Sequence, residues 1–144
     1  MSSLRGKRIL LTGGAGFLGR HVQEALLPFS PGEVFVPRRC DYDLREADQV
    51  RRCLADSRPQ IVLHLAASVG GIEANRRQPG AFFYDNAAMG LHLMEESRRF
   101  GVEKFVGIGS ICSYPKHTAV PFREDDLWEG YPEETNAQIG RAHV

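Results

Sequence analysis

Short apolar runs alternate with amphipathic stretches over the first 110 residues. The apolar runs predict buried strands, at 8–12, 33–36, 61–65 and 104–109. Apolar residues at helical spacing predict helices, at 17–27, 45–55, 81–100 and from about 134. Strands that alternate with helices are typical of parallel β-α-β units with right-handed crossovers. The pattern therefore predicts an α/β fold, a Rossmann-like doubly wound parallel sheet. We expect the order 3-2-1-4, with strands numbered along the chain, which leaves the fourth strand at an edge.

Composition narrows the class of protein. The chain has 144 residues, enough for one domain, and its 18 basic and 18 acidic residues give no net charge. That balance argues against a nucleic-acid partner or a polybasic membrane patch. The longest apolar run, residues 61–67, is too short to cross a bilayer, and no signal peptide is evident. Three cysteines without CxxC spacing favour a reducing, cytoplasmic setting and argue against a disulfide framework or a cysteine-rich zinc site, so we expect no metal.

The most informative motif is the glycine string between the first strand and the first helix. It reads Thr-Gly-Gly-Ala-Gly-Phe-Leu-Gly over residues 12–19. Glycine at its first position permits a tight turn, at the second a close approach to a pyrophosphate, and at the third close packing of the helix. The start of the helix offers unpaired N–H groups to the phosphates. We expect a dinucleotide to contact Gly13, Gly16, Phe17, Leu18 and Gly19; the alternative is a purely structural turn.

The end of the second strand bears on the choice of dinucleotide. An NAD site usually places an acid here, whereas this chain has Arg38 and Arg39. A guanidinium matches a 2′-phosphate, which favours NADP(H) over NAD; the alternative is a solvated loop. Asp43 and Leu44 follow and could reach the adenine edge, although Asp43 could equally cap the next helix.

Three further positions are candidates beside the cofactor. Ala66 and Ala67 follow the third strand and are small enough to let the chain pass close to a bound dinucleotide. His64, just before them, is interpreted as a packed strand residue. Asn86 lies within the long helix, where asparagine has no intrinsic preference, so we expect an internal role that supports the site.

Several segments together resemble a known family. They are the glycine loop, the Leu-Ala-Ala at 65–67, Ser-Val-Gly-Gly-Ile at 68–72, Gly-Ser-Ile-Cys-Ser-Tyr-Pro-Lys at 109–116, Pro-Phe-Arg-Glu-Asp at 121–125 and Tyr-Pro-Glu-Glu-Thr-Asn at 131–136. Over about residues 7–137 the chain resembles the extended short-chain dehydrogenase/reductase superfamily and, within it, the GDP-L-fucose synthase family.

The resemblance implies an NADP-dependent epimerase/reductase that acts on a nucleotide sugar, GDP-4-keto-6-deoxymannose, and dimerises with a second copy. It implies that Ser110 hydrogen-bonds the keto oxygen and that Cys112 is the base of the epimerisation. Proton abstraction beside a carbonyl needs such a base together with donors to the developing enolate. On residue chemistry alone Cys112 would be interpreted as an inert buried thiol, and the resemblance reverses that interpretation.

The family's Tyr-x-x-x-Lys pair is missing. None of the four tyrosines has a lysine four residues later; Ile139 and His143 stand at the family's two positions. The resemblance stops abruptly here, and codons of a common sequencing-adapter string would encode residues 139–144. We therefore expect residues 1–137 to be an incomplete NAD(P)-binding Rossmann domain, truncated after about four strands, and residues 138–144 to be a non-native tail. A catalytically silent dinucleotide-binding module, and another nucleotide-sugar epimerase or dehydratase, remain alternatives.

Overall fold

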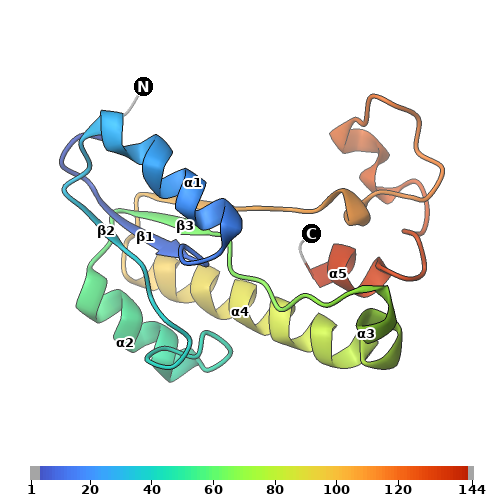
Figure 1. The fold of residues 1–144 in the computed structure, drawn as a ribbon, viewed down its shortest axis with the longest axis horizontal. Helices are drawn as coiled ribbons and strands as arrows, with labels where there is room; N and C mark the ends of the chain where they lie inside the picture. Colours follow the sequence, from blue (N-terminus) through green and yellow to red (C-terminus); the bar gives the residue numbers. More distant parts are fainter. Residues whose placement is uncertain (1–3, 143–144) are drawn as a thin grey trace. The chain divides into compact units, whose positions relative to one another are not determined.

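The computed structural model describes residues 4–142, and it forms two compact units. The first unit takes in the chain up to Ala67 and then Ala88–Ile108; the second takes in Ser68–Ala87 and the chain from Gly109 onward. Figure 1 shows the secondary-structure elements in colours that follow the sequence. Within the described residues, no helix combines the length and apolar character that crossing a membrane requires.

The first unit is a four-stranded parallel sheet in the order β2-β1-β3-β4. Its strands are β1 (Arg8–Thr12), β2 (Glu33–Phe35), β3 (Ile61–His64) and β4 (Lys104–Gly107). The predicted strands and the doubly wound fold are confirmed, but the predicted order 3-2-1-4 is wrong. The chain returns across β1 after β2, so that β3 pairs with β1 on its other side. β4 then pairs with β3 and ends the sheet, as predicted for the fourth strand.

Helices cover both faces of this sheet, as Figure 1 shows. They are α1 (Phe17–Leu26), α2 (Ala47–Ser57) and the part of α4 (Pro79–Arg99) from Ala88 onward. Adjacent strand residues point to opposite faces. Ile9 and Ile61 accordingly pack with Leu26 of α1, whereas Leu10 and Val62 pack in a larger cluster with α2 and α4.

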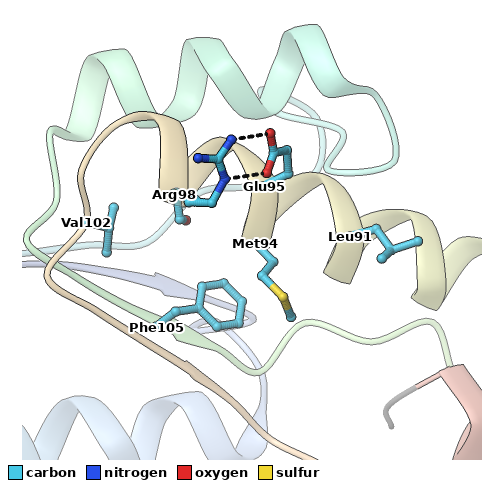
Figure 2. A pocket seen from close by; sticks show the side chains of 7 residues that line it. Leu91, Met94, Glu95, Arg98, Val102 and Phe105 are labelled. Atoms are coloured by element: carbon cyan, nitrogen blue, oxygen red, sulfur yellow. Dashed lines mark hydrogen bonds and ion pairs between the residues drawn. The ribbon is translucent and has the colours of Figure 1, made fainter.

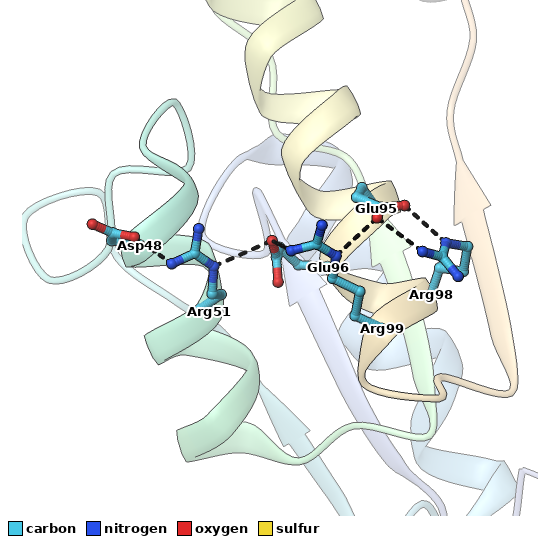
Figure 3. Close-up of polar contacts among 6 residues, drawn as sticks. All are labelled: Asp48, Arg51, Glu95, Glu96, Arg98 and Arg99. Atoms are coloured by element: carbon cyan, nitrogen blue, oxygen red, sulfur yellow. Dashed lines mark hydrogen bonds and ion pairs between the residues drawn. The ribbon is translucent and has the colours of Figure 1, made fainter.

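α2 and α4 are also joined by charged side chains, drawn in Figure 3. The carboxylate of Glu96 is 5% exposed and accepts hydrogen bonds from Arg51 Nε at 3.2 Å and Arg99 Nη1 at 3.3 Å. The neighbouring Glu95 accepts bonds from Arg98 and Arg99, which lower the pKa of its carboxyl to about 2. The ion pair of Arg51 and Glu96 therefore joins the two helices in addition to their apolar contact, and the other pairs lie within α4.

The free side of β4 adjoins a shallow groove of about 490 Å³ (Figure 2). Leu91 and Met94 of α4 line it together with Val102 and Phe105, and the pair of Glu95 and Arg98 lies beside them. Leu91 is 66% and Met94 is 55% exposed. Apolar side chains are thus exposed beside the uncovered fourth strand, a combination that favours association between chains.

The second unit has less regular structure. It contains α3 (Ile72–Arg77), the first part of α4, two short 3₁₀ helices (Ile111–Ser113 and Glu124–Trp128) and α5 (Ala137–Ala142). α3 was not predicted from the sequence; an ion pair between Glu73 and Arg77, four residues apart, supports it. α5 begins three residues later than predicted, because the Glu133 carboxylate accepts the amide of Thr135 and holds residues 133–136 in a turn.

Candidate functional site

The glycine loop lies at the carboxyl ends of the neighbouring strands β1 and β3. The sheet extends from this pair in opposite directions, with β2 beside β1 and β4 beside β3. Ligands of open α/β sheets bind at such a point. Gly13 has a φ of +71°, and a Cβ on it would lie 2.7 Å from the amide nitrogen of Ala66. Only glycine fits this position, because its backbone conformation and its contact with the chain after β3 both exclude a side chain.

The other two glycines of the loop meet different surroundings. A Cβ on Gly19 would lie 2.4 Å from the carbonyl oxygen of Gly13, so the first turn of α1 lies directly against the loop. A Cβ on Gly16 would approach only that same oxygen, at 3.2 Å, and would otherwise enter open space. Gly16 is the N-cap of α1, and no side chain caps the helix there. The helix therefore presents uncapped N–H groups beside a space that a phosphate can enter.

Phe17 and Leu18 begin α1 with their side chains turned to solvent. Phe17 is 84% and Leu18 is 50% exposed, and the Phe17 ring meets His21 edge-on with 4.8 Å between ring centroids. Their backbone follows Gly16 directly, so their contribution to phosphate binding would come from their N–H groups.

A buried hydroxyl joins the two strand ends beneath the loop. Thr12 Oγ1 lies 2.7 Å from His64 Nδ1 and accepts a hydrogen bond from the amide of Ala66 at 3.3 Å. Both side chains are buried, which confirms the interpretation of His64 as a packed strand residue. The sequence analysis passed over Thr12, although a hydroxyl residue directly before a glycine string is a recognisable signal. Ala66, beside Gly13, is half-buried, whereas Ala67 is exposed.

Gln23 is a second residue that the sequence analysis missed. Its side-chain amide, on the second turn of α1, donates to the carbonyl oxygen of Gly14 at 2.9 Å. The glycine loop is thus held from the side of the helix by Gln23 and from the side of the sheet by Thr12.

The segment after β2 carries both arginines that were predicted to select the cofactor. The carbonyl of Arg38 accepts the amides of Asp41 at 3.0 Å and of Tyr42 at 2.9 Å, which forms a turn with Arg39 at its tip. Within residues 4–142, the structure shows no hydrogen bond from the guanidinium of either arginine. Two cationic groups are therefore presented where the second strand ends.

Asp43 and Leu44 differ sharply in their surroundings. Asp43 accepts hydrogen bonds from the side chain and the amide of Arg45, and the guanidinium lowers the pKa of this carboxyl to about 2. The N-cap of α2 is Glu46, so the alternative role of Asp43 as that cap is wrong; its side chain makes a local turn that delays the helix to Ala47. Leu44 is 7% exposed and packs in the core.

The candidate catalytic residues lie in the second unit, on the segment that follows β4. Ser110 Oγ accepts a hydrogen bond from the amide of Cys112 at 3.1 Å and thereby begins the 3₁₀ helix Ile111–Ser113. The Cys112 side chain is half-buried. The hydroxyl of the next residue, Ser113, donates to the carbonyl of Gly140 at 2.9 Å, so α5 lies against this segment. The serine and the thiol are consequently close to each other on one ordered turn.

Asn86 has the internal role that was predicted for it. It is 3% exposed; its Oδ1 accepts the amide of Ser68 at 2.7 Å, and its Nδ2 donates to the carbonyls of Ser68 and Phe82, each at 2.8 Å. Asn86 thus fixes the chain directly after Ala67. A direct contact of Asn86 with a cofactor stays a prediction.

Ile139, which the resemblance aligns with the family's tyrosine, is 9% exposed in α5. An isoleucine side chain has no proton to donate to a substrate oxygen. His143, at the position of the family's lysine, lies outside the described residues. The cofactor candidates other than Asn86 fall in the first unit, whereas Ser110, Cys112 and Asn86 fall in the second.

Comparison with known proteins shows which family the chain resembles. A sequence profile of the NAD dependent epimerase/dehydratase family matches residues 9–138. The GDP-L-fucose synthase of Sinorhizobium fredii is 40% identical over 144 residues, which are 100% of this chain and 46% of that protein. This chain therefore spans about half the length of such relatives.

Solved structures agree in fold. A GDP-L-fucose synthetase from Naegleria fowleri bound to NADP superposes with a TM-score of 0.83 at 30% identity, over 99% of this chain and 42% of that one. The UDP-glucose 4-epimerase of Thermus thermophilus in complex with NAD superposes with a TM-score of 0.76 at 29% identity, over 94% of this chain and 47% of that one.

Proposed function

Because this chain belongs to the NAD dependent epimerase/dehydratase family, we propose that it is the dinucleotide-binding, N-terminal part of an NADP-dependent nucleotide-sugar epimerase/reductase. The reaction that fits best is the one of GDP-L-fucose synthase, which converts GDP-4-keto-6-deoxy-D-mannose to GDP-L-fucose. The 40% identity to the Sinorhizobium fredii enzyme supports this choice.

One observation carries the proposal of dinucleotide binding. The glycine loop lies at the switch point of the sheet, where Gly13 touches the chain at Ala66 and Gly16 faces open space. The uncapped start of α1 supplies N–H donors at the same place. These features fit a pyrophosphate, since its oxygens need donors and its bulk needs a backbone without side chains.

The two arginines after β2 support NADP over NAD. Arg38 and Arg39 follow the strand where a ribose 2′-phosphate would lie, and Arg45 already neutralises the nearby carboxylate of Asp43. A relative of similar fold carries NADP, although a more distant one carries NAD. Guanidinium groups attract a phosphate and gain nothing comparable from a hydroxyl.

Ser110 and Cys112 fit the epimerase and reductase roles. The Ser110 hydroxyl accepts the Cys112 amide, and its proton is left for donation to a keto oxygen. In this proposal the Cys112 thiol, half-buried two residues later, removes a proton from the carbon beside that ketone once the thiol is ionised. Bound NADPH would supply the hydride for the subsequent reduction.

Titration of the 144-residue chain with NADPH and NADH tests the proposal. We expect uptake of both, with NADPH bound more tightly. The variant Gly16→Val should abolish binding and keep the fold, because its side chain enters the phosphate space and meets only one backbone oxygen. Gly90→Ala is the matched control, since a Cβ there meets nothing within 4 Å. The proposal fails if the unmodified chain takes up neither nucleotide, or if Gly16→Val still binds them.

A catalytically silent binding module is the second candidate, and the isoleucine at position 139 favours it for this chain. We expect the 144-residue chain to reduce no ketone, because none of its tyrosines has the lysine four residues later that would lower the tyrosine pKa for proton transfer to the substrate oxygen. Measurable turnover of the keto sugar with NADPH would contradict this. The genomic sequence around codon 138 shows whether the gene itself lacks the Tyr-x-x-x-Lys pair. It also shows whether residues 138–144 are a non-native tail.

Three further attributes are proposed at the level of the whole enzyme. We place it in the cytoplasm, because the three cysteines of this chain are free, as is usual in a reducing compartment. We expect a nucleotide-sugar substrate and a homodimer. Light scattering of the complete enzyme checks the dimer, and a monomeric mass would contradict it.

A further inference from the structure

The segment that carries Arg38 and Arg39 is fastened to α2 by a second set of residues. Tyr42 closes the turn, and its hydroxyl donates to Asp56 Oδ2 on α2 at 2.8 Å. The guanidinium of Arg52, one turn earlier on the same helix, lies 5.0 Å above the centre of the Tyr42 ring. Arg52 also donates to the backbone carbonyl of Asp41. Three contacts therefore hold the end of this turn against one helix.

The same ring is held from the side of the sheet. Phe35, the last residue of β2, meets Tyr42 edge-on with 6.1 Å between ring centroids. Tyr42 thus lies between the end of β2 and α2, and both rings pack against the apolar core. The hydrogen bond to Asp56 raises the pKa of the Tyr42 phenol, so its proton stays in place at neutral pH.

The contacts of Tyr42 bear on where the two arginines are presented. The carbonyl of Arg38 accepts the amides of Asp41 and Tyr42, so the backbone that Tyr42 and Arg52 fasten is the backbone that closes the arginine turn. A guanidinium gains most from a phosphate when its position is fixed before binding, since ordering it costs conformational entropy.

We propose that Tyr42, Asp56 and Arg52 are positioning residues that set the preference for a 2′-phosphorylated dinucleotide by fixing the turn of Arg38 and Arg39. The inference rests on the proposed dinucleotide function. In this proposal the three residues act through the backbone of residues 38–42, which their contacts hold against α2. Contacts of the glycine loop with the pyrophosphate, shared by NADPH and NADH, are independent of them.

The proposal is tested by comparing the Kd of NADPH with the Kd of NADH in variants of the 144-residue chain. Tyr42→Phe removes the hydrogen bond and keeps the ring. It should weaken NADPH binding about fivefold, the factor that matches one hydrogen bond of typical net strength, and leave the Kd of NADH unchanged. Asp56→Asn and Arg52→Gln should act in the same direction. Adenosine 2′,5′-bisphosphate should lose affinity as NADPH does, whereas 5′-AMP should not.

Two matched controls sharpen the comparison. Asp48→Asn changes an exposed acid of α2 whose ion pair is with Arg51, and Tyr84→Phe changes an exposed tyrosine of the second unit; neither should alter the NADPH-to-NADH ratio. An unchanged ratio in Tyr42→Phe and Arg52→Gln, or an equal loss for both nucleotides, overturns the inference. Failure of the proposed function is seen separately, in the unmodified chain, as an absence of binding or of any NADPH preference.

Discussion

The two units of this chain are held together in different ways. In the first unit, apolar side chains from both faces of the sheet are fully removed from solvent, and both buried apolar clusters of the described residues lie there. In the second unit, the buried side chains include the polar residues Asn75, Asn86 and Ser113, which hydrogen-bond to backbone or to other side chains.

The difference matters for the candidate site. Apolar burial is non-directional, so it provides a stable frame for the glycine loop without specifying each contact. Hydrogen bonds between amide and hydroxyl groups are directional, and each one fixes a particular backbone atom. In the second unit, with Ser110 and Cys112, each of these hydrogen bonds should therefore have a local effect when it is removed.

The largest expected effect comes from the core of the first unit. Leu10 is fully buried, so Leu10→Ala should lower the free energy of unfolding by about 2–5 kcal/mol. Urea denaturation followed by circular dichroism measures it. The control Leu91→Ala changes a residue that is 66% exposed and should cost less than about 0.5 kcal/mol. Equal effects of the two substitutions would mean that the first unit lacks a packed apolar core.

The next effect is a loss of stability at alkaline pH that is confined to the first unit. Burial raises the pKa of the Cys53 thiol to about 12, above its ordinary value of 9.0. Between pH 9 and pH 12 the thiol ionises in the unfolded chain but stays protonated in the fold, so stability is complete below pH 9 and falls as the pH rises towards 12. Three pKa units correspond to an upper limit of about 4 kcal/mol.

Denaturation curves between about pH 8 and pH 12 follow this loss. Cys53→Ala should flatten the dependence, whereas Cys40→Ala, at an exposed cysteine, should leave it intact. A steep alkaline loss that persists in Cys53→Ala would assign it to another group.

A smaller, local effect is expected in the second unit. Asn86→Ala removes the three hydrogen bonds that fix Ser68 and Phe82, and it should cost about 1–3 kcal/mol. Hydrogen exchange should show faster exchange of the Ser68 amide, with the β1 amides unchanged. Asn86→Asp keeps the acceptor for the Ser68 amide but turns a buried carboxylate oxygen towards the two carbonyls, so it should cost at least as much as Asn86→Ala. Equal loss of protection in both units would contradict the contrast between them.

The smallest effect concerns one ion pair of the first unit. The Arg45 guanidinium lowers the pKa of Asp43 to about 2, so this pair stabilises the fold above about pH 4 and stops doing so as the pH falls through 2. Asp43→Asn should cost only about 1 kcal/mol at neutral pH, because solvent screens the half-exposed pair, and this cost should shrink as the pH falls towards 2. Asp125→Asn, at an exposed acid, is the control. A cost that is independent of pH would exclude this ion pair as the cause.

Much of the first unit could be predicted from local sequence. The strand at 8–12 and the glycines at 13, 16 and 19 are recognisable because apolar runs and glycine spacing act over a few residues. The same reasoning missed Tyr42 and Gln23. Their roles depend on partners, Asp56 and the carbonyl of Gly14, that only the folded chain brings near.

The sequence by itself determined the class of fold, the glycine loop and the two arginines after β2, because each is a property of neighbouring residues. Only the tertiary structure decided that β3 pairs beside β1, that Thr12 joins His64 to Ala66, and that Leu44 belongs to the core. Strand order and buried hydrogen bonds arise from contacts between residues far apart in the chain. Such contacts are selected by the total area buried and the polar groups satisfied, which no short stretch of sequence specifies.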